Sequence, residues 1–162
     1  MRRERLTKPM SLTLTGRRLI LWLLSLLAAA IGAWSLLFPA EWYYTFPDGS
    51  ASWGFGQWIL MDGPFNEHLI RDVGAMYLAL AGGGIVAALS KSVTATRAMA
   101  VAWIVFSAPH LVYHLQHLHG LPTIDLIGEP ISLALTLVLP LFLLGPERTR
   151  GPPVTQAKEV PR

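Results

Sequence analysis

The stretch LILWLLSLLAAAIGAWSLLF, residues 19–38, decides the fold class of this chain. Its twenty residues carry no charge and are mostly apolar, and as a helix they extend about 30 Å, the thickness of the hydrocarbon core of a bilayer. The run ends in aromatic residues and not at a small-residue cleavage site. We therefore interpret it as a retained transmembrane span and not as a signal peptide.

Three further apolar segments follow, at about residues 69–89, 98–118 and 126–144. The strongly apolar part of the last one, residues 130–144, extends only about 22 Å, so its helix has to begin within residues 123–129 to cross a bilayer. The composition agrees with a membrane protein, because 52% of the 162 residues are hydrophobic and 14% are charged, whereas soluble domains carry roughly a quarter charged residues. We predict an all-α membrane protein built as a four-transmembrane-helix bundle.

Lysine and arginine are distributed so unevenly that they orient the predicted spans. Twelve of the thirteen lie before the first span, between the second and third, or after the fourth, while Arg71 lies on the other side with seven of the ten acids. Because basic flanks stay in the cytoplasm, we predict a multi-pass protein of the cell membrane with both termini cytoplasmic. Residues 1–16 then form a basic cytoplasmic arm, residues 17–144 the membrane domain, and the proline-rich residues 145–162 a disordered cytoplasmic tail.

Two classes of partner follow from the same distribution. The apolar spans require a lipid bilayer, and a membrane-protein partner or a second copy of the chain is compatible with them. The basic residues form short flanks and no continuous basic face, so we do not expect nucleic acid as a partner.

The segment between the first two spans is rich in aromatic side chains. Residues 39–66 contain eight Trp, Tyr or Phe residues, and PDGS at residues 47–50 is a turn signal between two β-prone stretches. Aromatic rings favour the headgroup level of a membrane. We therefore expect a short aromatic extracytoplasmic hairpin between helices 1 and 2.

Small residues predict how the first two spans pack. On the second span, positions 68, 72, 75, 79, 82, 83 and 86 form one helical stripe that is small over most of its length. On the first span, Ser25, Ala28, Ala29 and Gly32 form a matching stripe. We expect contact between the two stripes, because small residues let membrane helices approach closely.

Eight ionisable residues near the extracytoplasmic side form the candidate site. On the third span, His110, His114 and His117 occupy positions i, i+4 and i+7 and share one face, and we expect His68 and Asp72 to meet that face at a similar depth. Ionisable groups inside a membrane are costly and are candidates for function by default. The cluster comprises His68, Arg71, Asp72, His110, His114, His117, Asp125 and Glu129.

Two interpretations of this cluster involve no bound metal. In the first, it is a structural network in which Arg71 pairs with Glu129, Asp125 or Glu67 and fixes the bundle geometry. In the second, it is the polar wall of a quinone or lipid pocket in an oxidoreductase or isomerase, where His110 and Glu129 transfer protons. The residues leave both open, and with them the question of whether the protein is an enzyme.

A further interpretation is a metal or haem site. Histidines at i and i+4 present two imidazoles in one direction, and a neighbouring carboxylate completes a set of zinc or copper ligands. The candidate ligands are His68, His110, His114 and Glu129, and His68 opposite a histidine of the third span would also serve bis-histidine haem. Because the chain has no cysteine, thiolate ligands and dithiol chemistry are excluded. The absence of any cofactor is equally compatible with these residues.

Two stretches, NEHLIRDVGAMYLALA at residues 66–81 and AWIVFSAPHLVYHLQHLHG at residues 102–120, carry a family resemblance. They resemble small four-span membrane proteins of actinobacteria whose function is unknown, broadly similar to the DoxX-like superfamily. The resemblance implies a four-helix membrane bundle. It also implies an accessory or structural role in a membrane complex, since DoxX itself is associated with quinone-linked oxidation.

Overall fold

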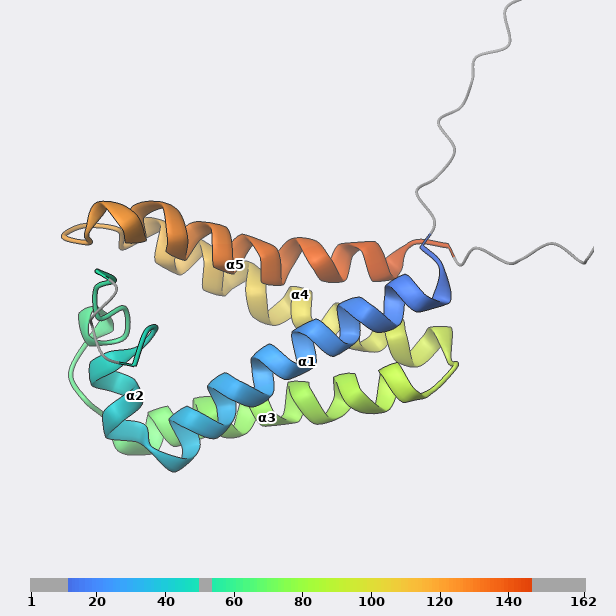
Figure 1. Ribbon diagram of the computed structural model, residues 1–162, viewed down its shortest axis with the longest axis horizontal. Helices are drawn as coiled ribbons and strands as arrows, with labels where there is room; N and C mark the ends of the chain where they lie inside the picture. The colour runs from blue at the N-terminus through green and yellow to red at the C-terminus, as the bar shows by residue number, and fades with distance from the viewer. Residues whose placement is uncertain (1–11, 50–53, 147–162) are drawn as a thin grey trace, which may run out of the picture.

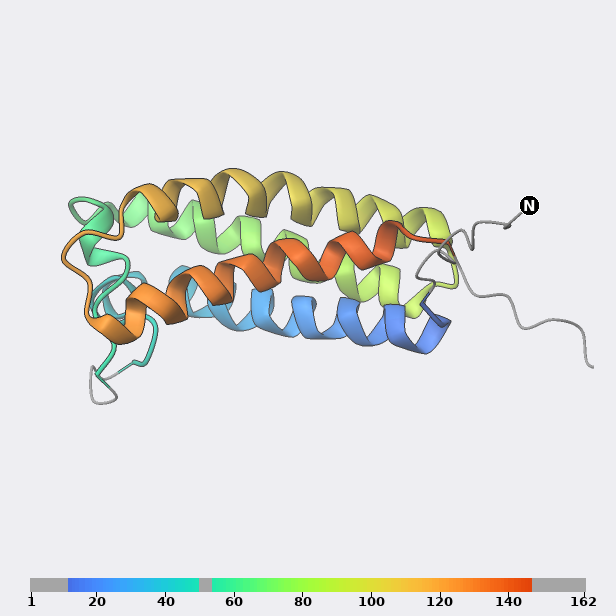
Figure 2. The ribbon, with the colours of Figure 1, turned by 90° about the horizontal axis from the view of Figure 1, so that it is seen from above.

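The computed structural model describes residues 12–49 and 54–146, and all of its long elements are helices. Four of them are long and apolar enough to cross a membrane, and they run side by side as a bundle (Figures 1 and 2). The predicted four-helix membrane bundle is confirmed. In chain order the elements are α1 (Leu14–Leu37), α2 (Pro39–Thr45), the 3₁₀ helix η1 (Leu60–Asp62), α3 (Glu67–Leu89), α4 (Val93–Gln116) and α5 (Thr123–Leu144).

The spans begin earlier than the apolar runs because polar residues cap their first turns. Thr13 accepts the Gly16 amide at 3.1 Å, Asn66 accepts an amide of α3 at 3.1 Å, and Ser92 accepts an amide of α4 at 3.2 Å. A side-chain oxygen that accepts one of the free amides of a first turn stabilises the helix start. As a result, α4 begins five residues before the predicted position 98. α5 has no side-chain cap and begins at Thr123, three residues before the predicted position 126.

Both ends of the described chain lie at the same end of the bundle, opposite α2 (Figure 1). This arrangement requires an even number of spans, as predicted. Most of the predicted arm and tail, residues 1–11 and 147–162, lies outside the described residues, and residues 14–16 of the predicted arm belong to α1.

The predicted β-hairpin between the first two spans is wrong for the part of this segment that the structure describes. Pro39 occupies the first turn of α2, where its missing amide costs nothing, and the chain is helical to Thr45. The segment does fold back on itself, because the Trp58 amide donates to the Phe46 carbonyl at 3.2 Å. Three of the aromatic residues that suggested strands, Trp42, Tyr43 and Tyr44, belong to α2, and Phe46 packs against Trp42 and Trp58.

α1 packs mainly against α3, along small residues on both helices. A Cβ atom added at Gly32 would lie 2.8 Å from the Gly74 carbonyl oxygen, and one added at Gly74 would lie 2.7 Å from the Leu36 amide nitrogen. The backbones of α1 and α3 are therefore in contact at Gly32 and Gly74, where neither helix has a side chain. The predicted contact stripe on α1 is confirmed at Ser25, Ala28 and Gly32, which are buried.

The predicted contact stripe on α3 is on the wrong face. The buried residues of α3 begin at Ile70 and Gly74, two positions after His68 and Asp72, and two positions turn a helix by about 200°. All but one of the predicted stripe positions are exposed, including Val86 at 66%. Small residues occur on both faces of α3, so their presence did not identify the buried one. The buried residues are Ile70, Gly74, Tyr77, Ala81, Gly84, Ala87 and Ala88.

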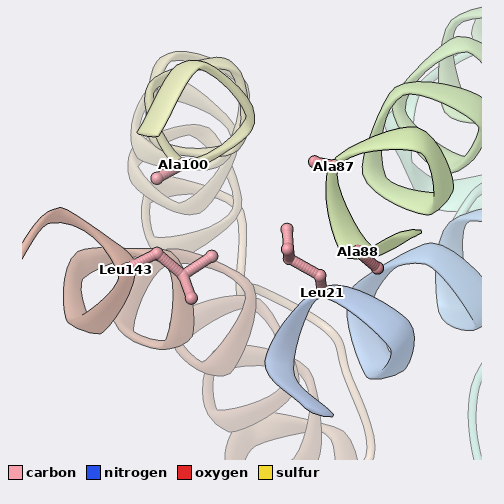
Figure 3. Close-up of a cluster of buried hydrophobic side chains, with 5 residues drawn as sticks. All are labelled: Leu21, Ala87, Ala88, Ala100 and Leu143. Atoms are coloured by element: carbon pink, nitrogen blue, oxygen red, sulfur yellow. The ribbon is translucent and has the colours of Figure 1, made fainter. Parts of the chain in front are cut away.

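The four spans converge at the end opposite α2. There Leu21 of α1 inserts between the alanines of α3 and faces Leu143 of α5 and Ala100 of α4 (Figure 3). Next to this cluster the Arg17 guanidinium, 2% exposed, donates to the carbonyls of Leu143 at 3.0 Å and Gly145 at 2.5 Å. These bonds satisfy carbonyl groups that the end of α5 leaves free.

Toward α2 the bundle separates into two pairs. α4 packs mainly against α5, as α1 does against α3, and contacts between the pairs are fewer. Figure 1 shows the two pairs diverging toward the end that carries α2. The site described next lies between them at this end.

Candidate functional site

A cavity of about 700 Å³ lies between the two helix pairs at the α2 end of the bundle. All four spans contribute to its lining, together with α2, η1 and the loop between them. The volume is within the range of sites that hold drug-sized molecules. Most of the lining is apolar, and its aromatic members are Trp34, Trp42, Phe46, Trp58, Tyr77 and Phe106.

The segment between α1 and α3, residues 38–49 and 54–66 of the described chain, closes the end of this cavity, and we call it the aromatic loop. Phe46 lies at the centre of a group of rings, with centroid distances of 6.0 Å to Trp34, 5.4 Å to Trp42 and 5.7 Å to Trp58. Trp42 is 5% exposed and packs against Ile70 of α3. Tilted and edge-to-face ring pairs at these distances are favourable. The aromatic loop therefore packs on α1 and α3 over this end of the cavity, and these contacts position the rings that line it.

The polar part of the lining is centred on α4 and α5. His114 Nδ1 lies 2.5 Å from Glu129 Oε1, and both side chains are almost completely buried. The His110 ring is next to His114, with centroids 4.7 Å apart, and stacks on Phe106 at 5.2 Å. We call His110, His114 and Glu129 the polar wall.

The polar wall follows from local sequence. His110 and His114 are one turn apart on α4, so their rings project in the same direction. Ser132 and Thr136 lie one and two turns after Glu129 on α5 and line the same cavity, and their hydroxyls donate to backbone carbonyls of their own helix at 2.8 Å. The face of α5 that lines the cavity is thus occupied by polar side chains.

Asp62 completes the polar side of the cavity from η1. Its side chain is exposed at the cavity mouth, yet surrounding protein raises the pKa of its carboxyl above the ordinary value. The largest cause is desolvation; His114 lowers the pKa, the Glu129 carboxylate raises it, and His117 lowers it. Sequence reasoning counted Asp62 only among the extracytoplasmic acids, because nothing in MDGP at residues 61–64 links it to the helices.

Asp125, the other acid of α5, has a different role. It is completely buried, and its Oδ2 accepts the Gly56 amide at 2.6 Å. A Cβ at Gly56 would lie 2.8 Å from this oxygen, so the loop approaches α5 as closely as only glycine allows. Asp125 thus anchors the aromatic loop to α5 and does not line the cavity.

The remaining predicted site residues lie elsewhere. His68 pairs with Asp72 at 3.3 Å on the exposed face of α3, and these side chains are 87% and 63% exposed. Arg71 pairs with Glu67 at 2.8 Å and donates to the Leu36 carbonyl. Glu67 is one of its three predicted partners, and Arg71 pairs with neither Glu129 nor Asp125. The structure therefore does not bring His68, Arg71 or Asp72 to the polar wall.

His117 also leaves the face that it was predicted to share. It is the C-cap residue of α4, and its ring stacks on Tyr113 with centroids 4.1 Å apart while Nδ1 bonds to the Tyr113 carbonyl at 2.7 Å. The helix ends at Gln116, so the i+7 position no longer follows the helical rotation. His114, by contrast, is still helical.

The predicted metal ligands are not assembled as a set. His110, His114 and Glu129 are neighbours, but His68 is paired on another face of α3. Within residues 12–49 and 54–146, no group of three or more His, Asp or Glu side chains is arranged to hold a metal ion. A haem held between His68 and a histidine of α4 has no facing pair of ligands here for the same reason.

Comparison with known proteins adds no family. No protein-family model, no curated protein and no solved structure matches the chain. The geometry of the cavity therefore carries the functional argument.

Proposed function

We propose that this membrane protein binds an amphipathic, membrane-soluble small molecule in the cavity between its two helix pairs. The observation that carries the proposal is the asymmetry of the lining: aromatic and aliphatic side chains cover most of it, while the ionisable groups are His110, His114, Glu129 and Asp62. An apolar pocket with a few convergent polar groups is the usual form of a small-molecule site.

His110 is the group that meets the polar part of the ligand. Among the residues that the structure describes, none is hydrogen-bonded to its ring, although His110 is half-buried and lines the cavity. His114 is already engaged by Glu129 at 2.5 Å. A buried polar group without a partner costs free energy, and a ligand that hydrogen-bonds to His110 recovers it.

The proposal includes the chemical class predicted from the sequence. A quinone or a lipid has an apolar body and a polar head, as this lining requires. His110 beside the His114–Glu129 pair is suited to transfer a proton to or from such a head, which is the acid–base step that an isomerase or an oxidoreductase acting on such a molecule requires.

We also propose that the cavity lies in the extracytoplasmic half of the cell membrane. Support comes from the charge distribution: the α2 end carries seven acids and Arg71, whereas twelve lysine and arginine residues belong to the other side. A separate accessory role in a membrane complex, with a protein partner or a second copy, stays a prediction and rests on the family resemblance alone.

The experiment compares two valine-to-tryptophan variants on α3. Val73 lines the cavity, so Val73→Trp fills it, whereas Val86 is 66% exposed on the lipid side and Val86→Trp serves as the matched control. Each protein is purified in mild detergent and its organic extract is analysed by mass spectrometry.

We expect a molecule that co-purifies with the wild type and with Val86→Trp and is lost in Val73→Trp. Equal amounts in all three proteins, with native circular dichroism, would contradict the proposal. Proteins that co-purify in the same preparation test the accessory role independently.

A further inference from the structure

The charge of the cavity indicates which polar head it accepts. Two carboxylates, Asp62 and Glu129, line it with two imidazoles, His110 and His114. The imidazole centroids are 4.7 Å apart, so a positive charge on one ring disfavours a positive charge on the other. With both carboxylates ionised, the lining carries one negative charge when a single imidazole is protonated and two when neither is.

Within residues 12–49 and 54–146, no permanent positive charge in the lining balances this. No lysine or arginine from the described part of the chain lines the cavity. Arg71, the basic residue of this end, is committed to Glu67 and to the Leu36 carbonyl. A net negative charge at the mouth and wall of an apolar cavity attracts a cation.

The rings of the lining favour the same charge. Six aromatic side chains face the cavity, three of them tryptophans. The face of an aromatic ring carries negative electrostatic potential and attracts a cation, most strongly for tryptophan, and more so where water is excluded. Cations with an apolar surface gain from this contact and lose little hydration.

We infer that the cavity selects lipophilic cations, such as quaternary ammonium or phosphonium compounds with an apolar body. This rests on the amphipathic ligand of the proposed function and changes the polar head: a cationic head that meets the carboxylates takes the place of an uncharged quinone head that hydrogen-bonds to His110. The carboxylates of Glu129 and Asp62 balance the cation, and the rings of the aromatic loop surround its apolar groups. Anionic amphiphiles such as fatty acids are rejected by the same two carboxylates.

The test uses three compounds of similar shape and different charge. The protein is reconstituted in lipid nanodiscs, and binding of tritiated tetraphenylphosphonium is measured with unlabelled triphenylacetate, an anion, or triphenylphosphine oxide, a neutral molecule, as competitor. Nanodiscs with Val73→Trp give the background of partition into lipid.

We expect saturable binding of the cation to the wild type and none above background to Val73→Trp. Glu129→Gln keeps an oxygen for His114 and removes one charge, and it should weaken binding by about tenfold or more. Asp62→Asn at the exposed cavity mouth should weaken it in the same direction. Asp72→Asn, which removes an acid from the exposed face of α3, should leave it unchanged.

Three results would overturn the inference. They are absence of saturable cation binding, displacement by the anion or the neutral compound as effective as by unlabelled cation, and equal affinity in Glu129→Gln, Asp62→Asn and wild type. Effective displacement by the neutral compound would leave the proposed function intact, because that proposal requires no charge. Failure of the proposed function is recognised separately, when the co-purifying molecule is kept in Val73→Trp.

Discussion

The contact between α1 and α3 leads to a prediction about two glycines of the same helix. Gly74→Ala places a methyl group 2.7 Å from the Leu36 amide nitrogen and 3.0 Å from the Gly32 carbonyl oxygen, whereas a methyl group at Gly82 meets no atom within 4 Å. Backbone atoms cannot rotate away, so the Gly74 variant has to separate the two helices. Gly84→Ala is intermediate, because the group it strikes first is the Ser25 side chain, which can rotate.

The expected magnitudes follow from these contacts. Inserting a methyl group into a close-packed contact costs about 1–3 kcal/mol, and replacing a helical glycine by alanine without a clash gains about 0.5–1 kcal/mol. Both glycines lie inside α3, so this gain applies to both variants and cancels in the comparison. The free energy of unfolding should therefore be lower in Gly74→Ala than in Gly82→Ala by about 1–3 kcal/mol.

The assay is reversible unfolding by SDS in mixed micelles, followed by far-UV circular dichroism. Gly82→Ala should match or exceed the wild type in stability. If it were instead the less stable of the two variants, the α3 face predicted from the sequence would be the packed one, and the observed contact would be refuted.

Three further predictions concern charged side chains. His114→Ala leaves a buried carboxylate without its partner and should lower the free energy of unfolding by about 3 kcal/mol, whereas His68→Ala, at an exposed pair, should change it by less than about 1 kcal/mol. Asp62→Asn should stabilise the protein at pH 7, and the gain over wild type should shrink as pH falls through the raised folded-state pKa and vanish below the ordinary carboxyl pKa, because a raised folded-state pKa penalises only the ionised form; a gain independent of pH would contradict this. Arg17→Met should cost about 2–4 kcal/mol by leaving two carbonyls at the end of α5 unsatisfied, and exposed Arg97→Met should stay within about 0.5 kcal/mol of wild type in the same SDS titration.

Part of the candidate site could be predicted from residues that are close in sequence. His110 and His114 share a face because one helical turn separates them, and Glu129, Ser132 and Thr136 share a face of α5 through the same helical spacing. Their meeting required α4 and α5 to be adjacent, which the short connection between them favours.

Other parts of the site depended on contacts that no local pattern encodes. Asp62 reaches the cavity because the loop before α3 folds over the bundle end, and Asp125 holds that loop through the Gly56 amide. His68 lies only two positions before Ile70, yet it is exposed while Ile70 is buried. The rotation of α3 about its axis decided which of these residues belong to the site.

The sequence by itself determined that this chain is a membrane protein of four helices with both described ends on one side. Hydrophobic length and helix caps are local properties, so they can be recognised without knowing the neighbours. Only the tertiary structure decided which helix faces meet and where the cavity lies. The physical reason is that lipid is as apolar as a protein core, so the apolar residues of a span do not distinguish its inner face from its outer face. Close fit decides instead, as between Gly32 and Gly74, and close fit exists only once both helices are in place.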